Sequence, residues 1–140
     1  MSSISFVSER ISFECPDPKS LGKWLHLVCA KEGKEIAELT YIFCSDEYLL
    51  NINQQHLQHD FYTDVITFDN SEDDSICGDI FISIDRVKEN AENIGVSLLD
   101  ELHRVMVHGL LHLIGYNDKT QEEKKAMTAQ EDFCLSLRSF

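Results

Sequence analysis

The spacing of hydrophobic and polar residues divides the chain into short strands and amphipathic helices. Alternation of apolar and polar positions, rich in β-branched and aromatic side chains, predicts strands, whereas apolar residues three or four positions apart predict helices. The predicted strands are 4–13, 36–44, 65–68 and 78–84, and the last two form a hairpin across a polar, acidic loop. The predicted helices are 20–32, a segment that follows 45–46, 85–94, 98 to about 114, and 120 to the C-terminus, the last with Phe133, Leu135 and Leu137 as its later apolar residues.

Residues that favour helix ends support these boundaries. Gly33 and Gly95 follow two of the predicted helices and are suited to close them. Ser97, with Asp100 three residues later, resembles a capping box that opens the next helix. The resulting order, β-α-β-α-β-β-α-α-α, predicts an α+β fold in which a small mixed β-sheet of about four strands packs with about five helices. A chain of 140 residues suits a single domain over 1–140.

Composition narrows the class of protein. Hydrophobic residues make up 43% of the chain, enough for one ordinary core, and the formal net charge of -13 counts against a broad nucleic-acid-binding surface. A bound divalent cation can still dominate its own neighbourhood. No apolar run is long enough to span a membrane, the N-terminus lacks signal-peptide features, and the five cysteines are widely spaced without a CxxC motif. These features favour a cytoplasmic protein with reduced thiols.

The stretch VMVHGLLHLIGYNDKT, residues 105–120, carries candidate metal chemistry. In a helix, His108 and His112 share one face a single turn apart, the geometry that places two imidazole nitrogens on one metal ion. Gly115 suits a left-handed helix end and lets the chain return toward the histidines, where Asp118 is the candidate third ligand. Two histidines and one carboxylate leave a fourth position open, which is typical of catalytic zinc sites. We predict one zinc ion, or another divalent transition metal, at these three residues.

Three further polar residues on the same predicted helix lie near this histidine pair in sequence. His103 faces roughly away from it, and Glu101 lies two turns before His108, too far along the helix axis to bind the same ion. Arg104 lies one turn before His108 on the same face. It can orient an anionic substrate, or it can be an ordinary solvated arginine.

The pattern HxxxHxxGxxD also matches the ligand spacing of the metzincin proteases. Those enzymes place a glutamate directly after the first histidine, where it acts as the general base. Here that position is Gly109, and no glutamate within the motif can replace it. A metzincin-like metalloprotease is therefore the less favoured alternative.

The segment HGLLHLIGYNDK, residues 108–119, resembles the signature of the YbeY-type endoribonucleases, the bacterial rRNA maturation factors. Two upstream segments, HDFYTDVITF (59–68) and GDIFIS (78–83), resemble further blocks of that family in the same order. The resemblance spans most of 36–118. Two positions depart from the family pattern. Asp118 stands where a third histidine ligand is usual, and Leu57 stands where an arginine implicated in activity is usual.

The resemblance implies a metal-dependent endoribonuclease that prefers single-stranded RNA and acts in 16S rRNA 3′-end maturation and ribosome quality control. Cleavage would be metal-assisted, with water or the RNA 2′-hydroxyl as the attacking group. No residue is assigned as the catalytic base, and Arg104, His56 and His59 are candidates to compensate for Leu57. Asp64 either orients a ligand histidine or caps the turn before the following strand.

The implied partner is single-stranded 16S precursor rRNA. Clustered lysines and arginines normally mark an RNA-binding face, and this chain offers few candidates: Arg86, Arg104, Lys119, Lys124 and Lys125. We therefore expect weak intrinsic RNA affinity, with ribosomal proteins or assembly factors supplying the targeting. The leucine at position 57 also keeps open a second alternative, a non-catalytic ribosome assembly factor that uses the metal for stability.

Overall fold

The computed structural model describes residues 3–57 and 62–140 and confirms the predicted order of elements. The strands are β1 (Ser3–Ser8), β2 (Glu35–Cys44), β3 (Val65–Asp69) and β4 (Ser75–Ser83). The helices are α1 (Pro18–Lys31), α2 (Asp46–Leu57), α3 (Ile84–Ile94), α4 (Leu98–Ile114) and α5 (Gln121–Ser136). Within the described residues, this is the predicted α+β fold of four strands and five helices.

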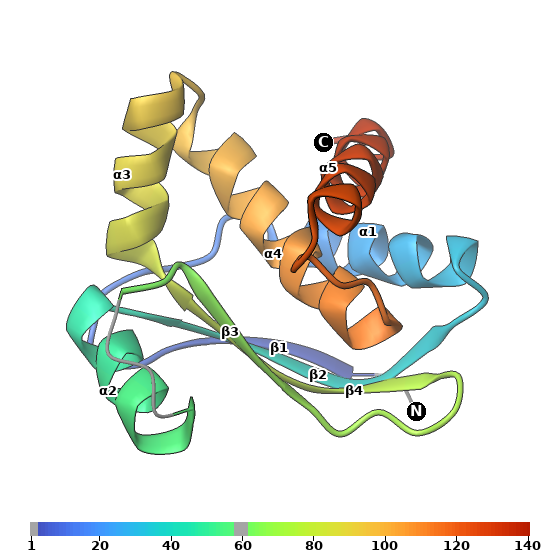
Figure 1. Ribbon diagram of the computed structural model, residues 1–140, viewed down its shortest axis with the longest axis horizontal. Helices are drawn as coiled ribbons and strands as arrows, with labels where there is room; N and C mark the ends of the chain where they lie inside the picture. Colours follow the sequence, from blue (N-terminus) through green and yellow to red (C-terminus); the bar gives the residue numbers. More distant parts are fainter. Residues whose placement is uncertain (1–2, 58–61) are drawn as a thin grey trace.

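The strands form one mixed sheet in the order β1-β2-β4-β3. β1 runs parallel to β2 and β2 parallel to β4, whereas β3 and β4 form the predicted antiparallel hairpin. Parallel neighbours need a crossover connection, and α1 supplies it between β1 and β2. β3 is therefore an edge strand of the sheet, close to α2 and α4 (Figure 1).

Helices cover the two faces of the sheet unequally (Figure 1). The main core lies between the sheet and the helices α1 and α4, and a smaller cluster lies under α2, where Leu49 packs with Ile66. Side chains alternate along each strand, so Ile80 joins the main core while its neighbour Phe81 packs against the smaller cluster. The largest fully buried side chains are Tyr41, Phe43, Leu21, Leu25, Ile36, Leu39, Leu49, Ile76, Ile80, Ile82, Leu102 and Met106.

Two predicted boundaries near turns were wrong. The strand predicted over 4–13 ends at Ser8, because Arg10 adopts a φ of 61°, which an extended strand excludes. Part of the predicted acidic loop is strand, since β4 already begins at Ser75. A short turn precedes it, in which Asp73 has a φ of 51° and Glu72 pairs with Ser75.

Close packing of α4 on the sheet depends on Gly109. A Cβ atom at this position would lie 2.8 Å from Cγ2 of Ile80 on β4, nearer than carbon atoms approach without displacement. The missing side chain lets the helix backbone approach the strand. His108, the preceding residue, is thereby held at the edge of the core, partly exposed beside β3.

The structure also bears on the sequence-based expectations about membrane spans and cysteines. Among the described residues, no helix is both long and apolar enough to cross a bilayer. All five cysteines are free; Cys29, Cys44 and Cys134 are buried and the other two are half-buried. This agrees with their expected role as small, mostly core, hydrophobic residues.

Candidate metal centre

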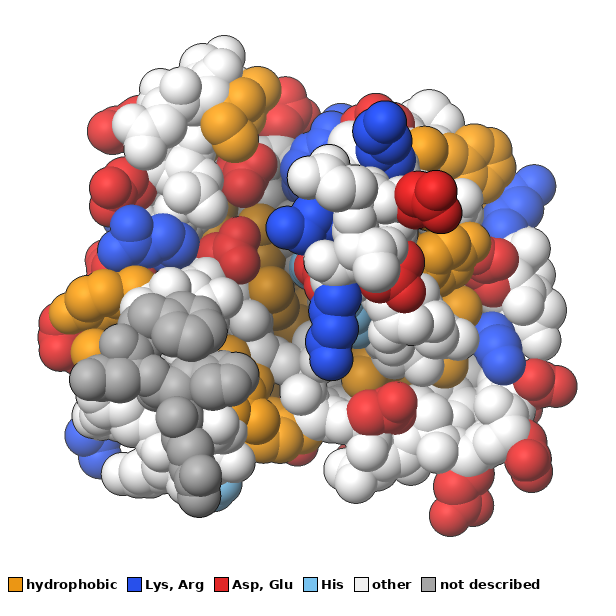
Figure 2. All heavy atoms as spheres, in the orientation of Figure 1, with side chains coloured by type: hydrophobic (Ala, Val, Ile, Leu, Met, Phe, Trp, Pro, Cys, Tyr) orange, Lys and Arg blue, Asp and Glu red, His pale blue; other side chains and the backbone are white. Residues whose placement is uncertain are grey.

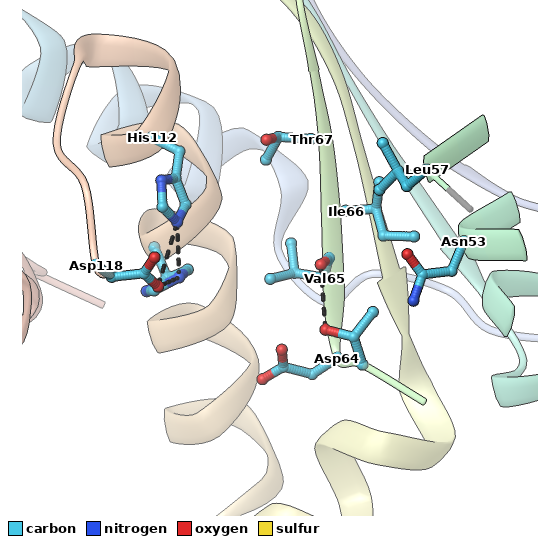
Figure 3. A pocket seen from close by; sticks show the side chains of 10 residues that line it. Asn53, Leu57, Asp64, Val65, Ile66, Thr67, His112 and Asp118 are labelled. Carbon is cyan, nitrogen blue, oxygen red and sulfur yellow. Dashed lines mark hydrogen bonds and ion pairs between the residues drawn. The ribbon is translucent and has the colours of Figure 1, made fainter. Parts of the chain in front are cut away.

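The end of α4 and the turn after it position the three predicted ligands. The Ser97 hydroxyl caps the start of α4 by accepting a hydrogen bond from the Asp100 amide, which confirms the predicted helix start. Gly115 ends the helix at a φ of 129°, a positive value that favours glycine, as predicted for this position. The chain then turns back along the helix, and Asp118 returns to the face that carries His108 and His112 (Figure 3).

The ligand atoms of these three residues converge on one point. His108 Nε2 lies 3.2 Å from Asp118 Oδ2, and His112 Nε2 lies 3.4 Å from the same oxygen. The two Nε2 atoms lie 3.1 Å apart. All three candidate atoms are within 4.8 Å of one another, and the three residues are half-buried. The structure thus brings together the histidines and carboxylate that the sequence predicted as a set.

The outer nitrogen of each imidazole is held by an acceptor. His108 Nδ1 lies 2.5 Å from Oε2 of Glu131, and His112 Nδ1 lies 3.0 Å from the carbonyl oxygen of Tyr116. A carbonyl oxygen only accepts, so Nδ1 of His112 carries the proton. The same assignment for His108 follows from the carboxylate of Glu131. Both Nε2 lone pairs therefore face Asp118.

This arrangement fits a divalent metal ion. Two imidazole lone pairs and a carboxylate oxygen converge, all of them acceptors, with a spacing that one cation can satisfy. Imidazole and carboxylate are ligands that zinc accepts, and the outer hydrogen bonds to a carboxylate and a carbonyl are those that usually orient zinc-bound histidines. Among the described residues, these three could therefore hold one metal ion.

Charges around the centre change the pKa of two groups. Burial lowers the pKa of His108, but the hydrogen bond and negative charge of Glu131, with Asp118 and Asp64, outweigh it, and the net shift is upward. Burial raises the pKa of Asp64, and His108 partly opposes that shift. The carboxylates that raise the His108 pKa give the site a negative local charge, which is compatible with a bound cation.

A cavity of about 350 Å³ adjoins the three side chains, a volume within the range of small-ligand sites (Figure 3). It lies between α4 on one side and β3 with α2 on the other. In Figure 3, the carboxylate of Asp64 points toward α4, and Leu57 lies across the cavity from His112. The lining residues are Asn53, Leu57, Thr63, Asp64, Val65, Ile66, Thr67, His108, His112 and Asp118.

Comparison with known proteins identifies the family. The family model described as "Endoribonuclease YbeY" matches residues 6–138. This chain belongs to the YbeY family. An Endoribonuclease YbeY of Cytophaga hutchinsonii is 55% identical over 98% of this chain and 96% of its own length. One of Porphyromonas gingivalis is 44% identical over 98% of this chain and 91% of its own length.

A solved structure extends the YbeY comparison to the fold. The solution structure of TM1509 from Thermotoga maritima superposes with a TM-score of 0.67 at 28% identity. The match covers 96% of this chain and 87% of the Thermotoga chain. The metal centre described above therefore lies within a fold that has been determined experimentally in a similar protein.

Other residues singled out in the sequence lie elsewhere in this YbeY-family structure. His103 is buried among Trp24 and Phe140, away from the histidine pair as predicted. Arg104 is not among the cavity-lining residues; it forms ion pairs with two carboxylates of α5. Its predicted catalytic role remains a prediction, as does that of His59, which lies outside the described residues.

Glu131 is the site residue that sequence reasoning missed. Phe133 is among the later apolar residues of α5, but it is 46% exposed and does not mark the inner face of the helix. The buried positions are Met127, Glu131 and Cys134. Their spacing of four and three residues placed a glutamate on the inner face of α5, and this was the available signal.

Proposed function

We propose that this chain is a metal-dependent endoribonuclease that cleaves single-stranded RNA during 16S rRNA 3′-end maturation and acts in ribosome quality control. The observation that carries the proposal is the convergence of His108, His112 and Asp118 beside the cavity, in a chain of the YbeY family. We further propose that these residues hold one zinc ion per chain. RNA is the proposed substrate because the relatives are named endoribonucleases.

The residues around the cavity can support phosphodiester cleavage. When bound, zinc supplies Lewis acidity toward a phosphate oxygen or a water molecule. His108, His112 and Asp118 would hold it beside the cavity that they line. Asp64 lines that cavity, and burial raises the pKa of its carboxyl. It is therefore the candidate residue for proton transfer at the reacting phosphate.

Leu57 supports a second candidate function, in which the protein does not cleave RNA. It lines the cavity with 40% of its surface exposed, at the position where the family resemblance places an arginine. A leucine cannot pair with a phosphate. The second candidate function is therefore a non-catalytic ribosome assembly factor in which the metal stabilises the fold. The protease alternative gains nothing from the structure, since Gly109 lies against Ile80 and offers no base.

Metal content is the first test. Elemental analysis of the purified wild-type protein should give about one metal ion per chain, and the His108→Ala variant should have lost it. His26→Ala, which removes a half-buried histidine of α1 outside the centre, serves as the control and should retain the metal. An unchanged metal content in His108→Ala would refute the site.

RNA cleavage is the second test. Wild-type protein should cleave single-stranded RNA with zinc present and should stop when a chelator is added. His112→Ala, purified in parallel, guards against a contaminating nuclease and should be inactive. If the metal-loaded protein leaves RNA uncut while cells lacking it accumulate unprocessed 16S precursor, the assembly-factor function replaces the nuclease. Casein cleavage would instead support the protease.

A further inference from the structure

Glu131 is a charged side chain buried under an otherwise apolar helix face. Only 8% of its side chain is exposed, and its neighbours on the inner face of α5 are Met127 and Cys134. A buried carboxylate is unfavourable unless it is paired and hydrogen-bonded. Its contacts therefore indicate what it does in this position.

Each oxygen of this carboxylate has a different partner. Oε1 accepts a hydrogen bond from Nη1 of Arg104 at 2.9 Å, and Oε2 faces Nδ1 of His108 at 2.5 Å. Arg104 lies one turn before His108 on α4, so both partners come from the same helix face. Nη2 of Arg104 also donates to Asp132 at 2.6 Å, but that carboxylate is 61% exposed, and an exposed ion pair contributes little.

A salt bridge for packing alone would need only the Arg104 contact. The second oxygen is instead directed at the imidazole whose other nitrogen faces Asp118 and His112. Because Oε2 accepts a hydrogen bond from Nδ1–H, the ring keeps its proton on Nδ1 and leaves the Nε2 lone pair free, which is the tautomer that binds a metal. The negative charge also raises the basicity of the ring. The contact on His108 thus has a consequence at the ligand atom.

We propose that Glu131 is a positioning residue of the metal centre, which fixes the ring orientation and tautomer of His108, and that Arg104 holds Glu131 in place. The inference rests on the proposed metal site at His108, His112 and Asp118 and deepens it. It gives α5 a direct part in metal affinity, although the three ligands all come from α4 and the turn that follows it.

Zinc affinity, measured by competition with a chromophoric chelator, tests the inference without relying on activity. Glu131→Ala should raise the dissociation constant for zinc by about 10- to 100-fold. Glu131→Gln retains an oxygen that can accept the hydrogen bond from Nδ1–H but loses the charge, so its dissociation constant should lie between those of wild type and Glu131→Ala. Asp132→Asn is the matched control, because Asp132 contacts Arg104 and is 61% exposed. Its affinity should stay within about twofold of wild type.

Cobalt substitution supplies a readout that a packing role would not change. The visible spectrum of bound Co²⁺ reports its ligand geometry, and it should differ from wild type in Glu131→Ala but not in Asp132→Asn. Unfolding of each variant in chelator checks that the metal-free fold is retained. If Glu131→Ala does not fold, the affinity and spectrum of Glu131→Gln decide the question.

The outcomes separate this inference from the metal site itself. Wild-type zinc affinity and an unchanged cobalt spectrum in the folded Glu131 variants would overturn the positioning role. If His108→Ala also lost no zinc, the metal site would fail as well. If His108→Ala loses zinc and the Glu131 variants do not, only the role of Glu131 is wrong.

Discussion

His103 and His108 lie five residues apart on α4 and have opposite surroundings. His103 is 6% exposed between the rings of Trp24 and Phe140, and its Nδ1 accepts a hydrogen bond from Arg138 at 2.8 Å. Burial and the positive charge of Arg138 lower the pKa of His103 to about 4, although Asp100 opposes the shift. His108, beside carboxylates, has a raised pKa. The first therefore belongs to the core and the second to the candidate metal centre.

The lowered pKa of His103 makes stability fall with acidity. The unfolded chain takes up a proton near the ordinary histidine pKa of about 6.5, whereas the folded chain resists it down to about 4. Stability from this group is thus present above about 6.5 and is lost as the pH falls toward 4. From pH 7 to pH 5, the free energy of unfolding of wild type should drop by about 1 kcal/mol more than that of His103→Gln.

Urea unfolding in chelator measures this difference without a contribution from bound metal. The other titrating groups are common to both proteins, so their contributions cancel in the comparison. Parallel pH profiles for wild type and His103→Gln would contradict the assignment.

Asp118 is one of the two positions at which this chain departs from the family pattern. If it closes the metal site, Asp118→Ala should weaken zinc binding by at least about 10-fold, since losing a ligand should cost no less than losing a residue that orients one. Asp118→His should retain zinc, because imidazole and carboxylate can both occupy the third position. The zinc content and affinity of the two variants check this. Equal affinity in wild type and Asp118→Ala would remove Asp118 from the site.

At the scale of elements, the contact between α4 and β4 positions the histidines. Gly109→Ala would place a Cβ 2.8 Å from Ile80 Cγ2, and overpacking of this kind costs about 1–3 kcal/mol, more than the gain of about 0.5–1 kcal/mol in helix propensity. We expect a net loss of unfolding free energy in urea titration. Gly22→Ala in α1 is the matched control, because its Cβ would meet nothing within 4 Å. It should be neutral or stabilising, and a stabilised Gly109→Ala would show that α4 can move away from the sheet.

Local patterns predicted α4 and the convergence of the three candidate ligands well, because each signal lies within a few residues. The i, i+4 histidines, the glycine at the helix end and Asp118 all belong to one stretch. Glu131 could not be assigned in the same way. Its role depends on how α5 packs against α4, a contact between residues 23 positions apart. The end of β1 was missed for a different reason, since nothing in the sequence around Arg10 signals its positive φ.

At the scale of the whole molecule, the distribution of charged side chains disfavours an extended RNA-binding surface. The net charge is -13, and acidic side chains are spread over the face shown in Figure 2. Lysine and arginine side chains lie beside the central hollow of that face, where histidine is visible (Figure 2). This distribution favours a narrow contact with RNA near the metal centre over an extended one.

The salt dependence of RNA binding tests that distribution. Lys119, Lys124 and Lys125 are exposed and follow Asp118 closely in the sequence. Each phosphate contact to a single strand adds about 0.7 to the magnitude of the slope of log K against log salt. With these three lysines as the contacts, we expect a slope of at most about 2. The dissociation constant should be about 10⁻⁴–10⁻⁶ M. Replacing Lys124 and Lys125 by glutamine should make the slope shallower by about 1.

Fluorescence anisotropy with a labelled single strand, in chelator to prevent cleavage, gives the slope directly. Lys19→Gln, at the start of α1, is the control and should leave both affinity and slope unchanged, because Lys19 does not line the cavity. Nanomolar affinity with a steep slope would contradict this prediction, because it would require an extended cationic RNA-binding surface. Weak, shallow binding would leave recognition of the 16S precursor to partners that bring the RNA to the metal centre.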